Sequence, residues 1–105
     1  PKNDAEGVLQ DVHWSGGAFG YFPSYCLGNM LAAQLSYAAN DQLSGLEENI
    51  AEGKFAPLLS CLKDNVYQHG KRYDLRELSL RATGRELSPG SLIRYLKERY
   101  LPLYQ

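Results

Sequence analysis

Apolar residues recur at intervals of three and four along most of the chain, and this spacing is typical of amphipathic α-helices. The first and longest helix is expected to begin at Pro23 or Ser24 and to end near Asn40. The positions that share one face of it are Leu27, Met30, Leu31, Gln34, Leu35 and Ala38. Before this helix, residues 15–21 combine three glycines with two aromatic rings and predict a sharply turning loop.

Two further helices are expected between residues 43 and 70. The first covers Leu43–Ala51 and ends at Gly53, because glycine readily adopts the left-handed conformation that closes a helix. The second begins at Pro57, which suits the first turn of a helix, and continues until Gly70. Its apolar face consists of Leu58, Leu62 and Val66 at four-residue steps.

The last two helices carry start signals of their own. Asp74 followed three residues later by Glu77 resembles a capping box, and Gly84 would end that helix. Ser88 before Pro89 is a start of the same kind for the final helix. The apolar side of this helix is formed by Leu92, Ile93, Tyr95, Leu96 and Tyr100. Because no convincing strand pair or internal repeat is present, the pattern predicts an all-α fold of about five helices preceded by a glycine/aromatic loop.

Composition narrows the class of protein further. The chain has 105 residues, of which 44% are hydrophobic and 22% charged, and these values are typical of one folded domain. The formal net charge is -1 and no basic stripe appears, so nucleic acid is not an expected partner. No apolar run approaches the roughly 20 residues that a membrane helix requires, so no membrane span is expected.

The two cysteines, Cys26 and Cys61, are far apart and do not form a metal-binding pair. They indicate neither a disulfide scaffold nor a zinc knuckle, and both are expected to be buried among apolar neighbours. A reducing, cytoplasmic compartment fits this usage best.

Residues that could take part in chemistry are concentrated in the first 25 positions. His13 could be a metal ligand, a general acid or a hydrogen-bond donor to a substrate, although a lone histidine more often makes a structural hydrogen bond. One histidine with one nearby aspartate is too little to define a metal site. Tyr21 and Tyr25 flank Pro23, where their hydroxyls could donate to a developing oxyanion. Gln10 and Asp11 could equally well be anchors that hold the loop in shape.

A sequence motif connects these residues to a known family. Gly7-Val8-Leu9-Gln10-Asp11-Val12-His13-Trp14 has the form Gly-x-x-Gln-Asp-x-His-Trp. It is followed by Gly20-Tyr21-Phe22-Pro23-Ser24-Tyr25, and later by Gly53-Lys54-Phe55-Ala56-Pro57-Leu58 and Tyr95-Leu96-Lys97-Glu98-Arg99-Tyr100. The chain therefore resembles the C-terminal part of the carboxypeptidase Taq family, the thermostable metallocarboxypeptidase 1 group. A motif with five fixed residues in eight positions is a specific signal.

The resemblance implies part of an all-helical, zincin-like metallopeptidase that removes residues from the carboxyl end of peptides. Family members bind zinc or cobalt through a His-Glu-x-x-His helix and a downstream glutamate, and this sequence contains no His-Glu-x-x-His. Because family chains are several times longer, residues 1–105 are expected to be one C-terminal helical region without metal or cofactor. Residues 1–22 would form the motif and cleft loop, and residues 23–105 the helical support.

The resemblance also implies roles for the residues of the motif. Tyr21 and Tyr25 would be oxyanion or substrate donors, and a second set would contact substrate, namely His13, Gln10, Asp11 and Trp14. The expected partners are a peptide substrate, the remainder of the parent chain and possible homodimers, and the fragment alone is expected to be inactive. The alternative is a small helical module that binds a peptide or protein through the Tyr21–Tyr25 turn without catalysis.

Overall fold

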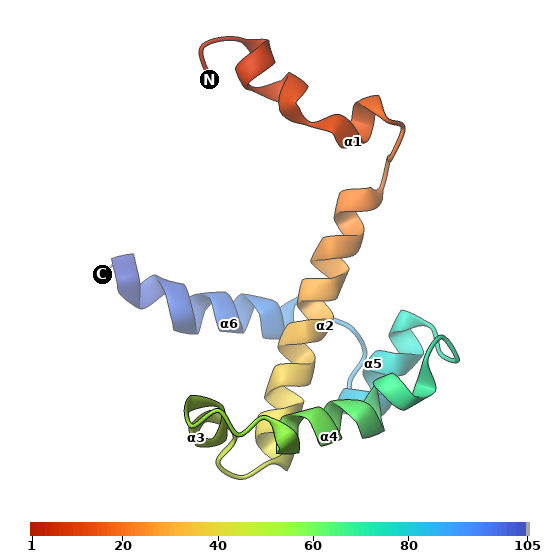
Figure 1. The fold of residues 1–105 in the computed structure, drawn as a ribbon, viewed down its shortest axis with the longest axis vertical. Helices are drawn as coiled ribbons and strands as arrows, with labels where there is room; N and C mark the ends of the chain where they lie inside the picture. Colours follow the sequence, from red (N-terminus) through yellow and green to blue (C-terminus); the bar gives the residue numbers. More distant parts are fainter. Residues whose placement is uncertain (105) are drawn as a thin grey trace.

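The computed structural model describes residues 1–104, and within them it is all-helical (Figure 1). The prediction of an all-α fold is confirmed, with six α-helices rather than about five and no strand among these residues. The α-helices are α1 (Val12–Ser15), α2 (Tyr21–Gln42), α3 (Leu46–Ala51), α4 (Ala56–Asn65), α5 (Leu75–Thr83) and α6 (Gly90–Tyr100). Single 3-10 turns lie at Asp4–Glu6, Val8–Gln10, Tyr67–His69 and Leu101–Tyr104.

The longest helix, α2, begins at Tyr21, which is two or three residues earlier than the predicted start at Pro23 or Ser24. Gly20 precedes it with φ 79°, and Tyr21 and Phe22 already belong to its first turn. Pro23 is therefore the third helical residue, a position where the missing N–H costs no hydrogen bond because the first four N–H groups have no partner within the helix. The segment before α2 is also not a loop throughout, because it contains α1 and two 3-10 turns.

The middle helices are shorter than predicted. α3 begins at Leu46 rather than Leu43, after Gly45 has turned the chain with φ 68°. Gly53 follows with φ 75°, as expected for a residue that ends a helix. α4 ends at Asn65 rather than just before Gly70, because the backbone leaves the helical region at Val66 (φ -129°). Asparagine and valine are weak helix formers, which is consistent with an end at this point.

Local signals predict α5 well and the start of α6 less well. Asp74 accepts a hydrogen bond from the backbone N–H of Glu77 at 2.8 Å, and Gly84 closes α5 with φ 72°. α6 begins at Gly90, after Pro89, and no side chain caps it. The predicted cap at Ser88 is wrong because Ser88 turns its backbone toward α2, where its N–H donates to the Gln34 side chain at 2.8 Å.

The core is small and is built around the middle of α2. α5 and α6 both pack on α2, and α3 contacts it near its end (Figure 1). Among residues 1–104, only four hydrophobic side chains are buried, namely Ala33, Ala39, Leu46 and Ala82. Apart from Leu46, these buried side chains are small, and larger apolar side chains such as Leu31 and Leu35 are half-buried around them.

A buried polar cluster joins α2 to α5 and to the segment that follows it. Gln34 is 4% exposed, and its Nε2 donates to the Glu86 carbonyl at 3.2 Å and to Ser79 Oγ at 3.4 Å. Its Oε1 accepts the Ser88 N–H. Ser79 is fully buried and donates to the Arg85 carbonyl at 3.1 Å. Both ends of the Gln34 amide are therefore satisfied, as burial of a polar group requires.

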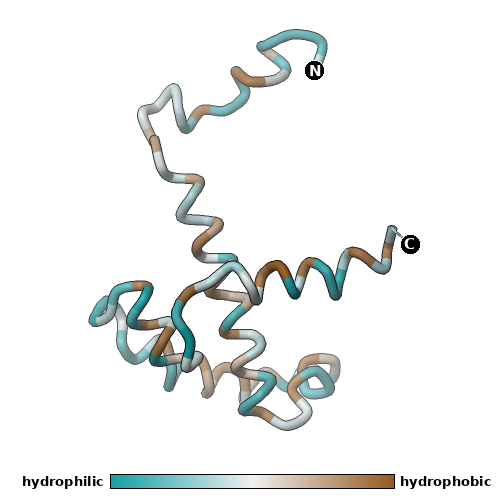
Figure 2. Tube along the Cα trace, turned by 180° about the vertical axis from the view of Figure 1, so that it is seen from behind, coloured by the Kyte–Doolittle hydropathy of each residue, from teal (hydrophilic) through white to brown (hydrophobic). Residues whose placement is uncertain are grey.

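Both ends of the chain project from this core (Figure 1). The radius of gyration is 17.7 Å, whereas a compact chain of this length would have about 13 Å. Hydrophobic positions lie along the projecting N-terminal segment and along α6 (Figure 2). Cys26, on the projecting part of α2, is exposed and not buried as predicted, and Cys61 is half-buried. Across residues 1–104, every helix is too short or too polar to cross a membrane.

A charged cluster holds α6 against α2. Glu98 accepts hydrogen bonds from Arg94 Nε and from the Tyr37 hydroxyl, both at 2.7 Å, and the Arg94 guanidinium lies 4.4 Å from the centre of the Tyr37 ring. The hydrogen bonds from Arg94, then from Tyr37, lower the pKa of Glu98 below its ordinary value. This carboxylate is thus bound in its ionised form by groups on both helices.

We expect replacement Glu98→Gln to lower the melting temperature at neutral pH but not at about pH 2. A carboxylate with a lowered pKa in the folded state stabilises the fold above its unfolded pKa, and that stabilisation disappears as the pH falls through the folded value. Thermal unfolding followed by circular dichroism at both pH values checks this. A difference of equal size at both pH values would contradict it.

Candidate functional site

The site begins with α1, which is short because both of its ends are fixed by local contacts. Asp11 Oδ1 accepts the backbone N–H of His13 at 2.9 Å and so caps the start of the helix. At the other end Gly17 adopts φ 77°, the Ala18 N–H donates to the His13 carbonyl, and the Gly17 N–H donates to the Trp14 carbonyl. This is a Schellman motif, which requires a residue that tolerates positive φ.

The turn after α1 brings His13 onto the beginning of α2. Gly20, with φ 79°, redirects the chain so that Tyr21 and Phe22 lie beside the imidazole. The ring centre of His13 lies 5.2 Å from that of Tyr21, with an interplanar angle of 19°, and 4.5 Å from that of Phe22. Three aromatic groups from two helices therefore pack together. Phe22 was not singled out from the sequence, although its place next to Tyr21 could have suggested it.

The Asp11 carboxylate contacts the imidazole of His13 at its Nδ1 atom. Its Oδ1 lies 3.1 Å from His13 Nδ1, and the two side chains are 35% and 37% exposed. The same oxygen therefore binds both the backbone N–H and the ring of His13. Among residues 1–104, His13 Nε2 has no hydrogen-bond partner, so this ring nitrogen is available to a ligand.

Tyr21 and Tyr25 lie one helical turn apart on α2 and share a hydrogen bond. The Tyr25 hydroxyl donates to the Tyr21 hydroxyl oxygen at 2.9 Å, and the rings are 5.2 Å apart in an edge-to-face arrangement. This donated hydrogen bond raises the pKa of Tyr25, and partial desolvation and the proximity of Tyr21 add to the effect. Because Tyr25 donates to Tyr21, the proton of Tyr21 is free to be donated elsewhere.

The remaining two residues of the predicted site lie apart from this cluster. Gln10 donates from Nε2 to the Ala5 carbonyl at 2.5 Å, so it links the two N-terminal 3-10 turns and not the glycine loop. The Trp14 side chain is 62% exposed. The structure thus joins Asp11, His13, Tyr21 and Tyr25, with Phe22 added, into what is called here the His–Tyr cluster.

The described part of the chain does not fit a metal ion. Within residues 1–104 there is no group of three or more histidine, cysteine, aspartate or glutamate side chains that could hold one. In the His–Tyr cluster the two possible metal ligands, Asp11 and His13, are hydrogen-bonded to each other. The cluster is instead suited to hydrogen bonding, with one phenolic donor and one free imidazole nitrogen.

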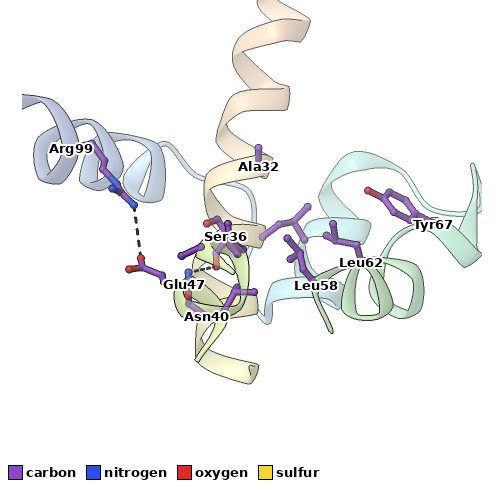
Figure 3. Close-up of a pocket in the computed structure, with 12 residues that line it drawn as sticks. Ala32, Ser36, Asn40, Glu47, Leu58, Leu62, Tyr67 and Arg99 are labelled. Atoms are coloured by element: carbon purple, nitrogen blue, oxygen red, sulfur yellow. Dashed lines mark hydrogen bonds and ion pairs between the residues drawn. The ribbon is translucent and has the colours of Figure 1, made fainter. Parts of the chain in front are cut away.

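A hollow lies at the opposite end of α2 (Figure 3). This groove has a volume of about 610 Å³ and runs between α2, α3 and α4, with aliphatic walls from Leu46, Leu58 and Leu62. The ion pair between Arg99 and Glu47, at 3.9 Å, lies at its side. Most of its lining is apolar, as in an incomplete hydrophobic core.

Comparison with known proteins identifies relatives of the whole chain. The sequence model of the family described as "Carboxypeptidase Taq (M32) metallopeptidase" matches residues 1–100. Carboxypeptidase 1 of Bacillus subtilis (strain 168) is 47% identical over 104 residues, which are 99% of this chain and 21% of the relative. Thermostable carboxypeptidase 1 of Thermus thermophilus is 43% identical over 104 residues, which are 99% of this chain and 20% of that relative.

Solved structures give the same result. Trypanosoma cruzi metallocarboxypeptidase 1 superposes with a TM-score of 0.88 at 44% identity, over 93% of this chain and 21% of that one. An M32 carboxypeptidase from Deinococcus radiodurans superposes with a TM-score of 0.87 at 42% identity, over 99% of this chain and 21% of that one. The chain thus spans about one fifth of the length of the relatives that it matches.

Proposed function

This chain belongs to the carboxypeptidase Taq (M32) metallopeptidase family, and from this premise we propose that it forms one wall of the peptide-binding cleft of a metal-dependent carboxypeptidase. In this proposal it is the C-terminal part of a longer enzyme that releases residues from the carboxyl end of peptides. Within the His–Tyr cluster, His13 contacts the substrate and Tyr21 the tetrahedral intermediate. The partners of the chain are the peptide and the rest of the enzyme.

The observation that carries the proposal is the hydrogen bond from Tyr25 to Tyr21. A hydroxyl that accepts one hydrogen bond becomes a better donor in its own right, because hydrogen bonds in a chain polarise one another. Tyr25 is protonated at neutral pH, as an ordinary tyrosine is, and the hydrogen bond to Tyr21 raises its pKa further, so Tyr25 keeps the proton that it donates. Tyr21 is therefore the donor that stabilises negative charge on the substrate, and Tyr25 supports it.

The metal is proposed to be zinc or cobalt held by the remainder of the enzyme, since the described residues of this chain do not fit one. The role derived for this chain needs no metal contact. Tyr21 donates a hydrogen bond, His13 offers Nε2, and the rings of Tyr21 and Phe22 fix the imidazole. On this proposal the isolated chain releases no amino acids from peptides.

A chimera tests this function directly. The chain would replace the matching segment of the Bacillus subtilis carboxypeptidase 1, to which it is 47% identical over 104 residues. We expect the chimera to release the C-terminal residue from a blocked dipeptide in the presence of zinc or cobalt, and the isolated chain to release none. A chimera that keeps its helicity, melting temperature and metal content but releases no residue would contradict the proposal.

A further inference from the structure

We propose that Asp11 is a positioning residue that fixes the tautomer and orientation of His13, so that Nε2 accepts a hydrogen bond from an N–H group of the bound peptide. The proposal rests on the function proposed above and assigns Asp11 a role other than contact with substrate. The two residues then have different tasks: His13 contacts the peptide, and Asp11 acts only by orienting the imidazole of His13.

One carboxylate oxygen of Asp11 contacts both the backbone and the side chain of His13. Asp11 Oδ1 lies 2.9 Å from the backbone nitrogen of His13 and 3.1 Å from its Nδ1. An ionised carboxylate only accepts hydrogen bonds, so a neutral imidazole in this position carries its proton on Nδ1. The proton on Nδ1 leaves a lone pair on Nε2, which makes Nε2 an acceptor.

The aromatic neighbours complete the restraint. Tyr21 stacks on the imidazole with an interplanar angle of 19°, and Phe22 packs at 56° to it. These ring contacts limit rotation of the imidazole about its Cβ–Cγ bond, and the hydrogen bond to Asp11 keeps the proton on Nδ1. Without that hydrogen bond the proton would be shared between Nδ1 and Nε2, and the substrate would meet an acceptor in only part of the molecules.

Asp11 also caps α1, so the test must separate the cap from the imidazole contact. Serine caps helices about as well as aspartate, but its side chain is too short to reach the ring. Asp11→Ser is therefore expected to keep the helix start while releasing the imidazole. Asp11→Ala, which loses both contacts, is the matched comparison.

The first measurement is the tautomer of His13 by nitrogen NMR of the 15N-histidine-labelled chain. The chain contains only two histidines, so His69→Gln assigns the signals. We expect Nδ1–H in the unmodified chain and a shift toward Nε2–H in Asp11→Ser. An unchanged tautomer ratio in Asp11→Ser, or Nε2–H as the main form in the unmodified chain, would overturn the assignment.

The second measurement is a double-mutant cycle in the chimera. Asp11→Ser should lower kcat/KM about 10- to 100-fold, a usual loss for a residue that orients a functional histidine. In the His13→Ala background the same replacement should have almost no further effect, because Asp11 acts through His13. Equal losses in both backgrounds would show a separate role and contradict the proposal.

The two measurements also separate this inference from the proposed function. An inactive but folded chimera together with the expected tautomer shift would reject the proposed function and keep the orientation of His13 by Asp11. An active chimera without a tautomer shift would reject the role of Asp11 and keep the function.

Discussion

Replacing Tyr21 with phenylalanine is expected to lower kcat of the chimera about 100-fold, within the range for loss of one oxyanion donor. Phenylalanine keeps the ring that stacks on His13, so the replacement removes only the hydroxyl. KM should change less than about threefold, because the lost hydrogen bond is strongest in the transition state. Steady-state kinetics on a blocked dipeptide measures both parameters.

Tyr25→Phe is the informative comparison for Tyr21→Phe. Because Tyr25 donates to Tyr21 and not to the substrate, its loss should lower kcat about 10-fold or less. Tyr104→Phe, at a side chain that is 86% exposed, should leave kcat unchanged. If Tyr25→Phe were the more damaging change, the two tyrosines would have the reverse roles, and unchanged kinetics in Tyr21→Phe would remove Tyr21 from the mechanism.

Gln34→Met is expected to lower the free energy of unfolding by about 3 kcal/mol, because it leaves buried groups without partners. Methionine has a similar length and helix propensity, but it can neither accept the Ser88 N–H nor donate to the Glu86 carbonyl. The loss is large relative to a core of four buried hydrophobic residues. Urea denaturation of the chain measures it.

Gln42→Met on the same helix is the matched control for Gln34→Met. Gln42 is exposed, so this change should alter the free energy of unfolding by no more than about 0.5 kcal/mol. Similar decreases in the free energy of unfolding in the two variants would show that the buried polar cluster around Gln34 does not hold α2, α5 and residues 85–88 together.

The sequence predicted best those features whose causes are local. α5 lies between Asp74 and Gly84, and both act on backbone groups within a few residues. The sequence predicts that α2 starts at Pro23 or Ser24, but Pro23 lies within the first turn, because a proline is tolerated at any of the first helical positions that lack an N–H partner. The sequence does not show that Gln34 is part of a buried hydrogen-bond cluster, because the hydrogen-bond partners of its side chain lie 45 to 54 residues away along the chain.

The same distinction applies to the candidate site. Asp11 and His13 are two residues apart, and Tyr21 and Tyr25 are four apart, so each pair follows from local helix geometry. The contact between the two pairs depends on the left-handed turns at Gly17 and Gly20. The sequence indicated a sharp turn there, but not that the imidazole would lie on the Tyr21 ring.

The length of α2 gives it the property of a lever arm. Tyr21 and Gln34 lie thirteen residues apart on one uninterrupted helix, which corresponds to about 20 Å of rise. A tilt of about 3° at Gln34 would therefore move Tyr21 by about 1 Å, enough to lower a turnover rate about 100-fold. Substitutions in the Gln34 cluster should thus reduce turnover even in molecules that remain folded.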